Sequence, residues 1–449
     1  MKNRIHKFFL NNRYIVLDVY SGAVHVVDGI VYDILDYYKT DSLEEIKETL
    51  KEKYHISQIE EAYEEIKTLE KEGLLYSDEI DTNNINYNTD NVIKAMCLHV
   101  AHDCNLRCKY CFASQGDFKG QRLLMDLEVG KRALEFLCEN SGKRRNLEVD
   151  FFGGEPLMNF EVVKELVSYG REIEKKYNKH FRFTITTNGV LLDEEKIDYI
   201  NKNMDNVVLS IDGRREINDI MRKTITGKGS YDVILPKIKD FVDKRGDKDY
   251  YIRGTFTSYN LDFSKDALHF YEQGFKKISI EPVVTSPDMD YALKEEHLEE
   301  ILSEYEKFSK EYIDIKKKDK EFLFFHFMID LNQGPCLAKR SIGCGAGSEY
   351  IAVTPEGDIY PCHQFVGEEK FKLGDIFNGI TNVEKREEFK KANVFNKEEC
   401  HNCWAKFYCS GGCHANAYYT NKDILKPYKL GCEMEKKRIE CAISILANL

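Results

Sequence analysis

The chain has 449 residues, of which 77 are Asp or Glu and 65 are Lys or Arg, so its formal net charge is −12. This length is typical of roughly two to four domains. The acidic balance argues against nucleic acid as a partner, and no apolar run reaches the ~18 residues of a membrane span. Fourteen cysteines without an N-terminal export signal favour metal binding in a cytoplasmic protein over disulfide bonds.

The first 80 residues predict a small separate unit. Asn11-Asn12 is a turn signal between two β-type runs, while Asp28 and Ser42 precede helix-like segments as capping residues do. A DNA-binding winged helix has this order of elements, but the acidic last helix disfavours phosphate contact, which leaves peptide binding or a purely structural cap. The expected strands are residues 6–10, 14–19, 23–27 and 74–76, and the expected helices are residues 29–38, 43–54 and 56–72.

Residues 81–91 are polar, rich in Asn and without periodicity, and are expected to form a linker. From residue 92 to residue 285, strand-like and helix-like segments alternate, which predicts an α/β domain with a parallel sheet. Six units are too few for a complete TIM barrel and predict a partial (β/α)6 barrel. The expected strands are residues 95–100, 147–152, 181–186, 206–211, 250–256 and 277–280, and the expected helices are residues 127–140, 160–177, 193–203, 231–244 and 263–273.

Three thiols lie within eight residues directly after the first of these strands, at Cys104, Cys108 and Cys111. The Asn, Arg and Lys residues between them favour a loop. Crowded thiolates repel one another unless a metal neutralises them. A structural zinc site uses four ligands and a [4Fe–4S] cluster usually uses four thiolates, so three would leave one iron open to a ligand from outside the protein. A zinc knuckle and a ferredoxin fragment are the alternatives.

Polar motifs also follow the later strands, at the carboxyl ends where reactive groups gather in barrels. Two glycines after the second strand would let the backbone approach a ligand closely. In isolation, the motif after the third strand would be an ordinary turn, and the arginine beyond the fourth strand a surface charge. These motif residues are Gly153, Gly154, Glu155, Asn188, Ser210, Asp212 and Arg222.

The pattern C-x-x-x-C-x-aromatic-C, with Tyr110 before the third cysteine, resembles the signature of the radical S-adenosylmethionine (SAM) enzymes. In that family the open iron binds SAM, and one electron then yields a 5′-deoxyadenosyl radical that takes a hydrogen atom from the substrate. The resemblance implies that Cys104, Cys108 and Cys111 hold this cluster. It implies SAM contacts for Tyr110, Gly153, Gly154, Glu155, Asn188, Ser210, Asp212 and Arg222, the last at the SAM carboxylate.

Residues 286–335 are mostly charged helix, such as residues 293–317, and are expected to bridge to a last domain at residues 336–449. There a run with a turn at Gly357 predicts a hairpin that brings Cys344 and Cys362 towards one end. The spacing that follows is C-x(2)-C-x(5)-C-x(3)-C and a distant cysteine. A zinc ribbon at residues 400–413 is the main alternative to iron–sulfur clusters.

This cysteine spacing resembles the SPASM domain, which carries two auxiliary [4Fe–4S] clusters. The resemblance implies an outer cluster on Cys400, Cys403, Cys409 and Cys432, and an inner cluster on Cys344, Cys362 and Cys413, with Cys336 as a candidate fourth ligand. Without Cys336, the inner cluster would have an open iron where a substrate thiolate could bind. The remaining cysteines, Cys97, Cys138 and Cys441, are expected to be buried apolar residues. His363, His401 and His414 are assigned to local packing or to support of the ligands.

Taken end to end, the chain resembles peptide maturases of the radical SAM/SPASM group, and most of all the clostridial maturases of six-cysteine (SCIFF) peptides. The resemblance implies thioether bonds between Cys sulfur and a carbon of another residue in a Cys-rich precursor peptide. The peptide would bind through its leader at the N-terminal unit, with residues 23–27 as the strand that the leader joins. An external electron donor of ferredoxin or flavodoxin type and an anaerobic host are also implied.

Four alternatives remain open. The anaerobic sulfatase maturases, which make formylglycine, share the last two domains but would not need the leader-binding unit. Carbon–carbon cross-linking of a peptide is a second enzymatic alternative. An iron–sulfur electron carrier and a cluster-sensing regulator are the non-enzymatic ones. Formation of 5′-deoxyadenosine from SAM would distinguish an enzyme from both.

Overall fold

The computed structural model describes residues 4–79, 92–331, 341 and 343–449, so the expected linker and Cys336 lie outside the described residues. The N-terminal unit is an antiparallel sheet of order β1-β2-β3 followed by three helices. Asn11 and Asn12 form the β1–β2 turn with φ of 50° and 62°, a left-handed conformation that Asn tolerates. The elements are β1 (Ile5–Leu10), β2 (Arg13–Asp18), β3 (Val24–Val27), α1 (Gly29–Ile34), α2 (Leu43–Leu50) and α3 (Ile56–Lys71).

Side-chain caps fix where these helices begin. The Asp28 side chain accepts a hydrogen bond from Val31 N, and Ser42 and Glu45 form a reciprocal capping box at the start of α2. The strand expected at residues 74–76 is wrong, because the chain turns there. Tyr76 has a left-handed φ of 52° and a buried ring that stacks on Tyr38, a conformation that no strand residue adopts.

A parallel sheet forms the centre of the molecule, and all six expected barrel strands are present in it. Its order is β13-β12-β11-β9-β8-β7-β4-β14, and every neighbouring pair in this run is parallel. The sequence prediction did not include β13, and it placed β14 in the C-terminal hairpin without joining it to this sheet; these two strands extend the run at its two edges. The strands are β4 (Ala95–His102), β7 (Asn146–Gly153), β8 (His180–Thr187), β9 (Asn206–Ser210), β11 (Tyr251–Phe256), β12 (Lys277–Pro282), β13 (Leu323–Phe324) and β14 (Tyr350–Val353).

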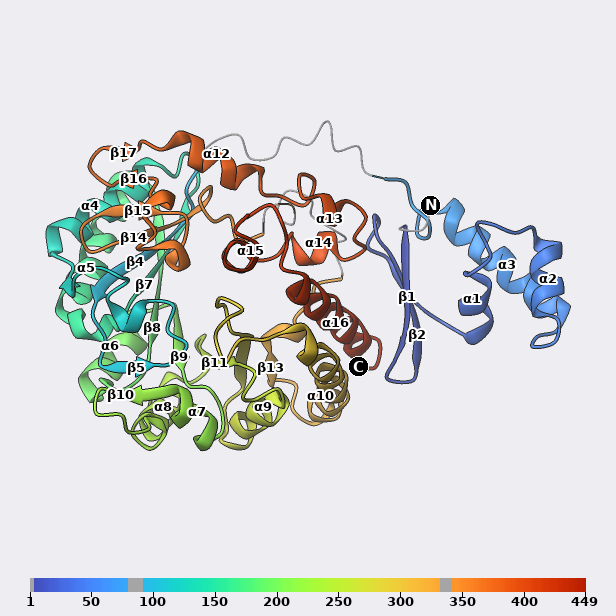
Figure 1. Cartoon of the computed structure of the whole chain (residues 1–449), viewed down its shortest axis with the longest axis horizontal. Coiled ribbons are helices and arrows are strands. Elements are labelled where there is room, and N and C mark those ends of the chain that lie inside the picture. Colours follow the sequence, from blue (N-terminus) through green and yellow to red (C-terminus); the bar gives the residue numbers. More distant parts are fainter. Residues whose placement is uncertain (1–3, 80–91, 332–340, 342) are drawn as a thin grey trace.

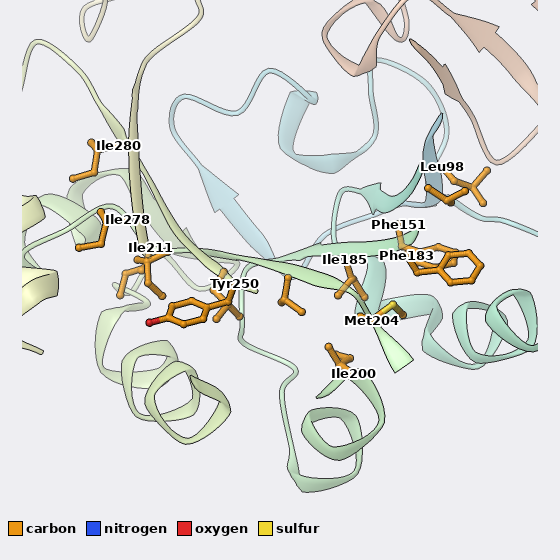
Figure 2. Packing of buried hydrophobic residues seen from close by; sticks show 14 of the residues in the cluster. Leu98, Phe151, Phe183, Ile185, Ile200, Met204, Ile211, Tyr250, Ile278 and Ile280 are labelled. Carbon is orange, nitrogen blue, oxygen red and sulfur yellow. The ribbon is translucent and has the colours of Figure 1, made fainter. Parts of the chain in front are cut away.

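Helices cover the outer face of this sheet, where alternate strand residues such as Val149, Phe151 and Phe183 are fully buried. Figure 2 shows how labelled residues of the strands and of α6 contribute to this layer, with Ile200 and Met204 near Ile185. The short helix α7 was not expected, because its charged sequence lacks a clear apolar stripe. These helices are α4 (Leu127–Glu139), α5 (Phe160–Tyr177), α6 (Glu194–Asn203), α7 (Arg215–Met221), α8 (Tyr231–Arg245) and α9 (Phe263–Glu272).

The C-terminal region joins the barrel through its expected hairpin. Strand β14 pairs in parallel with β4 and antiparallel with β15, and Gly357 between them has a φ of +94°. The remaining strands are β5 (Leu106–Cys108), β6 (Leu123–Leu124), β10 (Arg222–Thr224), β15 (Asp358–Tyr360), β16 (Gly374–Asp375) and β17 (Gly379–Ile380). The remaining helices are α10 (Leu298–Lys318), α12 (Val383–Lys391), α13 (Glu398–His401), α14 (Lys406–Cys409), α15 (His414–Asn421) and α16 (Lys429–Leu446).

Helix α16 links all three parts of the molecule. Figure 1 shows it between α10 of the barrel side and strands β1 and β2 of the N-terminal unit. The apolar side chains of Phe8, Ile15 and Leu17 form one cluster with Ile439 and Ile443 of α16. His6 stacks on Trp404 with ring centroids 3.7 Å apart and is hydrogen-bonded to Glu440 at 2.9 Å. None of the described helices is both long and apolar enough to cross a membrane.

Candidate active site and cluster-binding cysteines

A cavity of about 340 Å³ lies at the carboxyl ends of the barrel strands. Cys104, Cys108 and Cys111 border it, and so do His363 and Gln364, which directly follow Cys362. Because it reaches from the barrel cysteines to the C-terminal region, this cavity connects the two parts of the chain that carry the cysteine motifs.

Of the three barrel cysteines, Cys108 lies in a small ribbon rather than in the expected loop, whereas Cys104 and Cys111 lie outside strands and helices, as expected. Residues Leu106–Cys108 form β5, which pairs antiparallel with β10 and places Arg222 opposite Cys108. This pairing outweighs the polar composition of the segment. The pKa of the Cys104 thiol is raised to about 11 and that of Cys108 to about 12; burial is the largest cause, and neighbouring thiols act in the same direction. Free thiols would therefore stay protonated near neutral pH, and metal binding would have to displace their protons.

Gly153 and Gly154 allow the end of β7 to lie directly against the segment that carries the cysteines. Gly153 has a φ of +131°, and a Cβ there would overlap the carbonyl oxygen of Ala101. A Cβ on Gly154 would overlap the carbonyl oxygen of Asp103. The N–H groups of Gly154 and Glu155 donate to these two carbonyls at 2.8 and 2.9 Å. The glycines thus allow a close approach to the neighbouring backbone, and because both also line the cavity, their contact with a ligand stays a prediction.

Glu155 and Asn188 join the ends of β7 and β8 to this segment. The buried Glu155 carboxylate accepts hydrogen bonds from Leu157 N at 3.0 Å, from Thr187 Oγ1 at 2.7 Å and from Asn188 N at 2.8 Å. These donors lower its pKa, but burial is the larger effect and raises it. Most of the acceptor capacity of Glu155 is used within the protein. The amide of Asn188 reaches further and donates to Asn105 Oδ1 at 2.8 Å.

Tyr110, Asp212 and Arg222 form a buried hydrogen-bonded group beside Cys108. The Tyr110 hydroxyl donates to the Asp212 carboxylate at 2.8 Å and accepts from Arg222 Nη1 at 2.8 Å. Burial raises the pKa of Asp212 to about 6, against the lowering effect of Arg222. Asp212 departs from the expectation that it faces SAM, because it lies behind Tyr110 and does not line the cavity. Arg222 does line it, and its buried Nε has no hydrogen-bond partner among the described residues.

The cavity also contains polar side chains that the sequence motifs did not reveal. Ser210 borders it as expected, together with Asp150, Thr186 and Arg253 from the interior of the barrel. Thr186 Oγ1 donates to Asp150 at 3.2 Å, and burial raises the pKa of Asp150 to about 7. Arg253 is exposed to this space although it lies in the middle of β11. The sequence could have indicated this residue, because Arg253 is a charged residue inside a strand whose neighbouring residues are buried, on the face that points into the barrel.

The C-terminal cysteines form two groups. Burial raises the pKa of Cys362 and of Cys409 most, and nearby thiols act in the same direction: Cys413 and Cys344 on Cys362, and Cys432, Cys400 and Cys403 on Cys409. The second group lines a separate cavity of about 670 Å³. Burial is the main cause of the raised pKa values, which reach about 12 for Cys409 and about 11 for Cys432. The first group contains Cys344, Cys362 and Cys413, and the second contains Cys400, Cys403, Cys409 and Cys432; the role of both groups as cluster ligands stays a prediction.

The other cysteines and the histidines have ordinary surroundings. Cys97, Cys138 and Cys441 are buried, as expected. His363 is hydrogen-bonded to the Tyr350 hydroxyl at 3.2 Å, and burial lowers its pKa to about 4. His414 bonds to the Ala392 carbonyl oxygen, and His401 bonds to that of Phe395.

Comparison with known proteins identifies the family. Residues 98–257 match the radical SAM superfamily, and residues 344–404 match the iron–sulfur cluster-binding SPASM domain. Over 220 residues the chain is 30% identical to an uncharacterised protein of Methanocaldococcus jannaschii, and this match covers 49% of the chain and 70% of that protein. The chain belongs to the radical SAM superfamily. It is a radical SAM enzyme whose cofactors are SAM and more than one [4Fe–4S] cluster.

Characterised relatives cover different shares of this radical SAM chain. A cysteine-type anaerobic sulfatase-maturating enzyme of Clostridium perfringens is 26% identical over 77% of the chain and 95% of its own length. The radical SAM cyclopropyl synthase TigE of Paramaledivibacter caminithermalis is 24% identical over 91% of the chain and 89% of its own length.

Two solved structures show the same fold. Native anSMEcpe with bound AdoMet superposes with a TM-score of 0.65 and 23% identity, and the match covers 79% of the chain and 98% of that structure. Streptococcus suis SuiB bound to the precursor peptide SuiA superposes with a TM-score of 0.54 and 16% identity. The SuiB match covers 96% of the chain and 98% of that structure, so it includes the N-terminal unit.

The residues at the barrel cavity fit the cofactors of the family. Three thiols with raised pKa values border a space that also contains an unpaired buried Arg222 Nε, which suits a cluster and a ligand with an anionic group. Within the described residues, no three His, Cys, Asp or Glu side chains converge on one metal-ion position. A [4Fe–4S] cluster binds each thiolate through a different iron, so it does not need such convergence.

Proposed function

We propose that this radical SAM enzyme installs thioether bonds in a Cys-rich, ribosomally made precursor peptide, linking Cys sulfur to a carbon of another residue. The observation that carries the proposal is the single cavity that borders both the barrel cysteines and the residues after Cys362. A substrate held there would lie between a site of hydrogen-atom abstraction and a site that can bind a thiolate. Each bond removes two hydrogens from the peptide: a hydrogen atom from carbon, a proton from sulfur and one electron to a redox partner.

In this proposal Cys104, Cys108 and Cys111 hold the cluster that binds SAM. When bound, SAM and its cluster supply hydrogen-atom abstraction from the substrate. Arg222 pairs with the carboxylate of SAM through its free Nε, and Tyr110 with Asp212 holds the guanidinium in place. Asn188 and Ser210 supply hydrogen bonds at the ends of β8 and β9, and Gly153, Gly154 and Glu155 position the cysteine segment.

Two auxiliary clusters bring the proposed number of [4Fe–4S] clusters to three. Cys400, Cys403, Cys409 and Cys432 are the proposed ligands of the outer cluster, and Cys344, Cys362 and Cys413 those of the inner one. If Cys336 supplies the fourth inner ligand, the inner cluster is closed. If a substrate thiolate supplies it, the inner cluster takes part in the sulfur chemistry. Within the cavity, Arg253 and the Asp150–Thr186 pair are the proposed contacts for the peptide, because they face the space and are not part of the SAM-binding set.

The N-terminal unit is the proposed binding site for the leader of the peptide. Among the described residues β3 pairs only with β2, so its other edge is open. In an antiparallel pair, successive residues of a strand direct their N–H and C=O groups alternately towards the partner strand and away from it. The hydrogen bond from Asp18 N to Ala23 O shows that Ala23 faces β2, so Val24 and Val26 direct these groups to the open edge. An extended leader can join such an edge as a further strand. The SuiB structure with bound SuiA matches the chain over this unit as well.

The proposal also places the protein in a reducing cytoplasm, where the proposed ligand cysteines stay free of disulfide bonds and can bind iron. A ferredoxin or flavodoxin is the proposed external electron donor.

The decisive test is anaerobic incubation of the reconstituted enzyme and SAM with a candidate Cys-rich precursor, followed by mass spectrometry. The expected product loses two hydrogens per bond and has fewer thiols that react with an alkylating reagent. A peptide of unchanged mass, with SAM consumed in its presence, would contradict the proposal.

Formylglycine formation is the second candidate, because the sulfatase-maturating relative matches the barrel and C-terminal region over 95% of its length. The same incubation with a Cys-containing sulfatase peptide tests it. Conversion of that peptide but not of the Cys-rich precursor would favour sulfatase maturation. A leader-dependent product on the precursor alone would favour the thioether proposal.

Leader binding can be tested by the substitution Val26→Pro, which removes one N–H group from the open edge of β3. Proline is tolerated at sheet edges, so the fold should persist while the affinity for a leader peptide falls by about tenfold, the effect of roughly one lost hydrogen bond. Val26→Ala keeps the N–H group and is the matched control. Equal affinities of both variants in a fluorescence-anisotropy titration would exclude this edge as the leader site.

A further inference from the structure

Lys397 is a buried cation between the two groups of C-terminal cysteines. Its side chain is almost fully buried, with a relative exposure of 1%. The ammonium group donates to the carbonyl oxygen of Gly411 at 2.6 Å. Gly411 lies between Cys409 of the outer group and Cys413 of the inner group, so this one contact places the charge beside both.

The charges that face Lys397 are thiols rather than carboxylates. The groups that most influence its pKa are Cys400, Cys409, Cys413 and Cys432, all of which tend to raise it, although burial is the larger effect and lowers it. No ion pair of Lys397 with a carboxylate occurs among the described residues. A buried cation is stable only when an opposite charge compensates it. Among the described residues, the candidates for this opposite charge are the thiolates of the two groups, three from the outer set and one from the inner.

Two neighbouring lysines differ from Lys397 in this respect. Lys436 forms an ion pair with Glu433 at 2.8 Å and is partly exposed. Lys406 donates to the His401 carbonyl oxygen and to the Tyr20 hydroxyl of the N-terminal unit. Lys436 is therefore a cation whose charge is already balanced by a carboxylate and screened by water, and it provides a matched comparison.

We infer that Lys397 is a redox-tuning residue shared by the two auxiliary clusters, whose fixed positive charge stabilises the reduced state of both. The inference rests on the ligand sets proposed above. A reduced cluster carries one more negative charge than the oxidised one, and net charge and hydrogen bonding around a cluster set its reduction potential. A buried charge acts strongly because little water screens it. Through Gly411 the same ammonium fixes the chain between Cys409 and Cys413, and so couples the two sites.

The test is an EPR-monitored redox titration of the fully reconstituted enzyme, comparing wild type with Lys397→Gln. Glutamine keeps a donor for the Gly411 carbonyl but removes the charge. At a fixed solution potential the ratio of reduced to oxidised auxiliary cluster should fall about tenfold for both sites, which is 59 mV for a one-electron couple. The cluster on Cys104, Cys108 and Cys111 should keep its potential and serves as an internal standard.

Lys436→Gln is the control, and it should change the auxiliary potentials far less than Lys397→Gln does. Unchanged auxiliary potentials in Lys397→Gln would overturn the inference, and so would equal shifts in both variants. If Lys397→Gln fails to load auxiliary iron, Lys397→Arg decides the matter. Normal loading of auxiliary iron in the arginine variant would show that a positive charge is required at this position. If neither variant loads auxiliary iron, Lys397 has only a packing role and the inference is overturned. Absence of auxiliary clusters in the wild type would instead contradict the proposed ligand sets.

Discussion

The barrel cysteines and the C-terminal cysteines belong to one chain but have contrasting surroundings. The barrel group borders a cavity shared with hydrogen-bonding side chains and with the unpaired Nε of Arg222. The outer C-terminal group lies among lysines, of which Lys397 is buried and Lys406 nearly so. The first arrangement suits a cluster that takes up and releases a small ligand, and the second suits an outer cluster that stays closed and exchanges electrons. The difference shows that the residues around the thiols, more than the thiols themselves, set what each cluster can do.

The largest effect is expected from Cys108→Ala, which removes the most deeply placed thiol of the barrel group. SAM cleavage should fall by on the order of 100-fold or more, since even supporting residues of metal sites contribute up to this factor. Chromatographic measurement of 5′-deoxyadenosine tests this. Cys138→Ala, a buried cysteine of α4 outside all three groups, should leave cleavage intact. Normal SAM cleavage in Cys108→Ala would contradict the claim that the barrel cysteines, unlike the C-terminal cysteines, hold the cluster that binds SAM.

The next effect in size is expected from Gly154→Ala, which places a methyl group on the carbonyl oxygen of Asp103. The cysteine segment would have to move, at a cost of about 1–3 kcal/mol for overpacking. Iron at the barrel group and SAM cleavage should both decrease, while auxiliary iron stays unchanged. Gly120→Ala is the control, because the added Cβ would contact only the Asp117 carbonyl oxygen at 3.5 Å. Equal iron contents and cleavage rates for the two variants would refute the positioning role of Gly154.

The smallest effect concerns pH. Burial raises the pKa of Asp150 to about 7, whereas the unfolded chain has the ordinary value near 4. The folded state therefore binds an extra proton between these values, and the stability that this group contributes is lost as the pH rises through about 7. The melting temperature of the holoprotein should be lower at pH 8 than at pH 6.5, and Asp150→Asn should remove this part of the difference. An identical pH dependence in the asparagine variant would mean that Asp150 is already ionised at pH 6.5.

The sequence was sufficient for the features that depend on local pattern. The alternation of strand-like and helix-like segments predicted the six barrel strands, because helices that cross over between parallel strands impose that order. Asn11-Asn12 and Gly357 marked turns because few residues adopt positive φ. The resemblance of the cysteine spacing to the SPASM domain implied which described thiols lie together.

Features that depend on long-range pairing could not be read from the sequence. The ribbon between β5 and β10 joins segments more than 100 residues apart, and at Leu106–Cys108 it replaced part of the expected loop. The attachment of β14 to β4 joins the C-terminal hairpin to the barrel sheet. Asp212 has the expected place in the chain, but Tyr110 occupies the space between it and the cavity. Arg253 and Lys397 look like ordinary surface charges until the fold places one in the cavity and buries the other.

The central claim is that only the barrel group binds SAM, while the C-terminal groups hold clusters independently of it. The most direct measurement is EPR spectroscopy of dithionite-reduced enzyme with and without SAM, for the wild type and for a variant with Cys104, Cys108 and Cys111 all changed to Ala. We predict that SAM alters one cluster signal of the wild type, and that the variant retains auxiliary signals that do not respond to SAM. A signal in the variant that still responds to SAM, or the loss of all cluster signals from it, would contradict the claim.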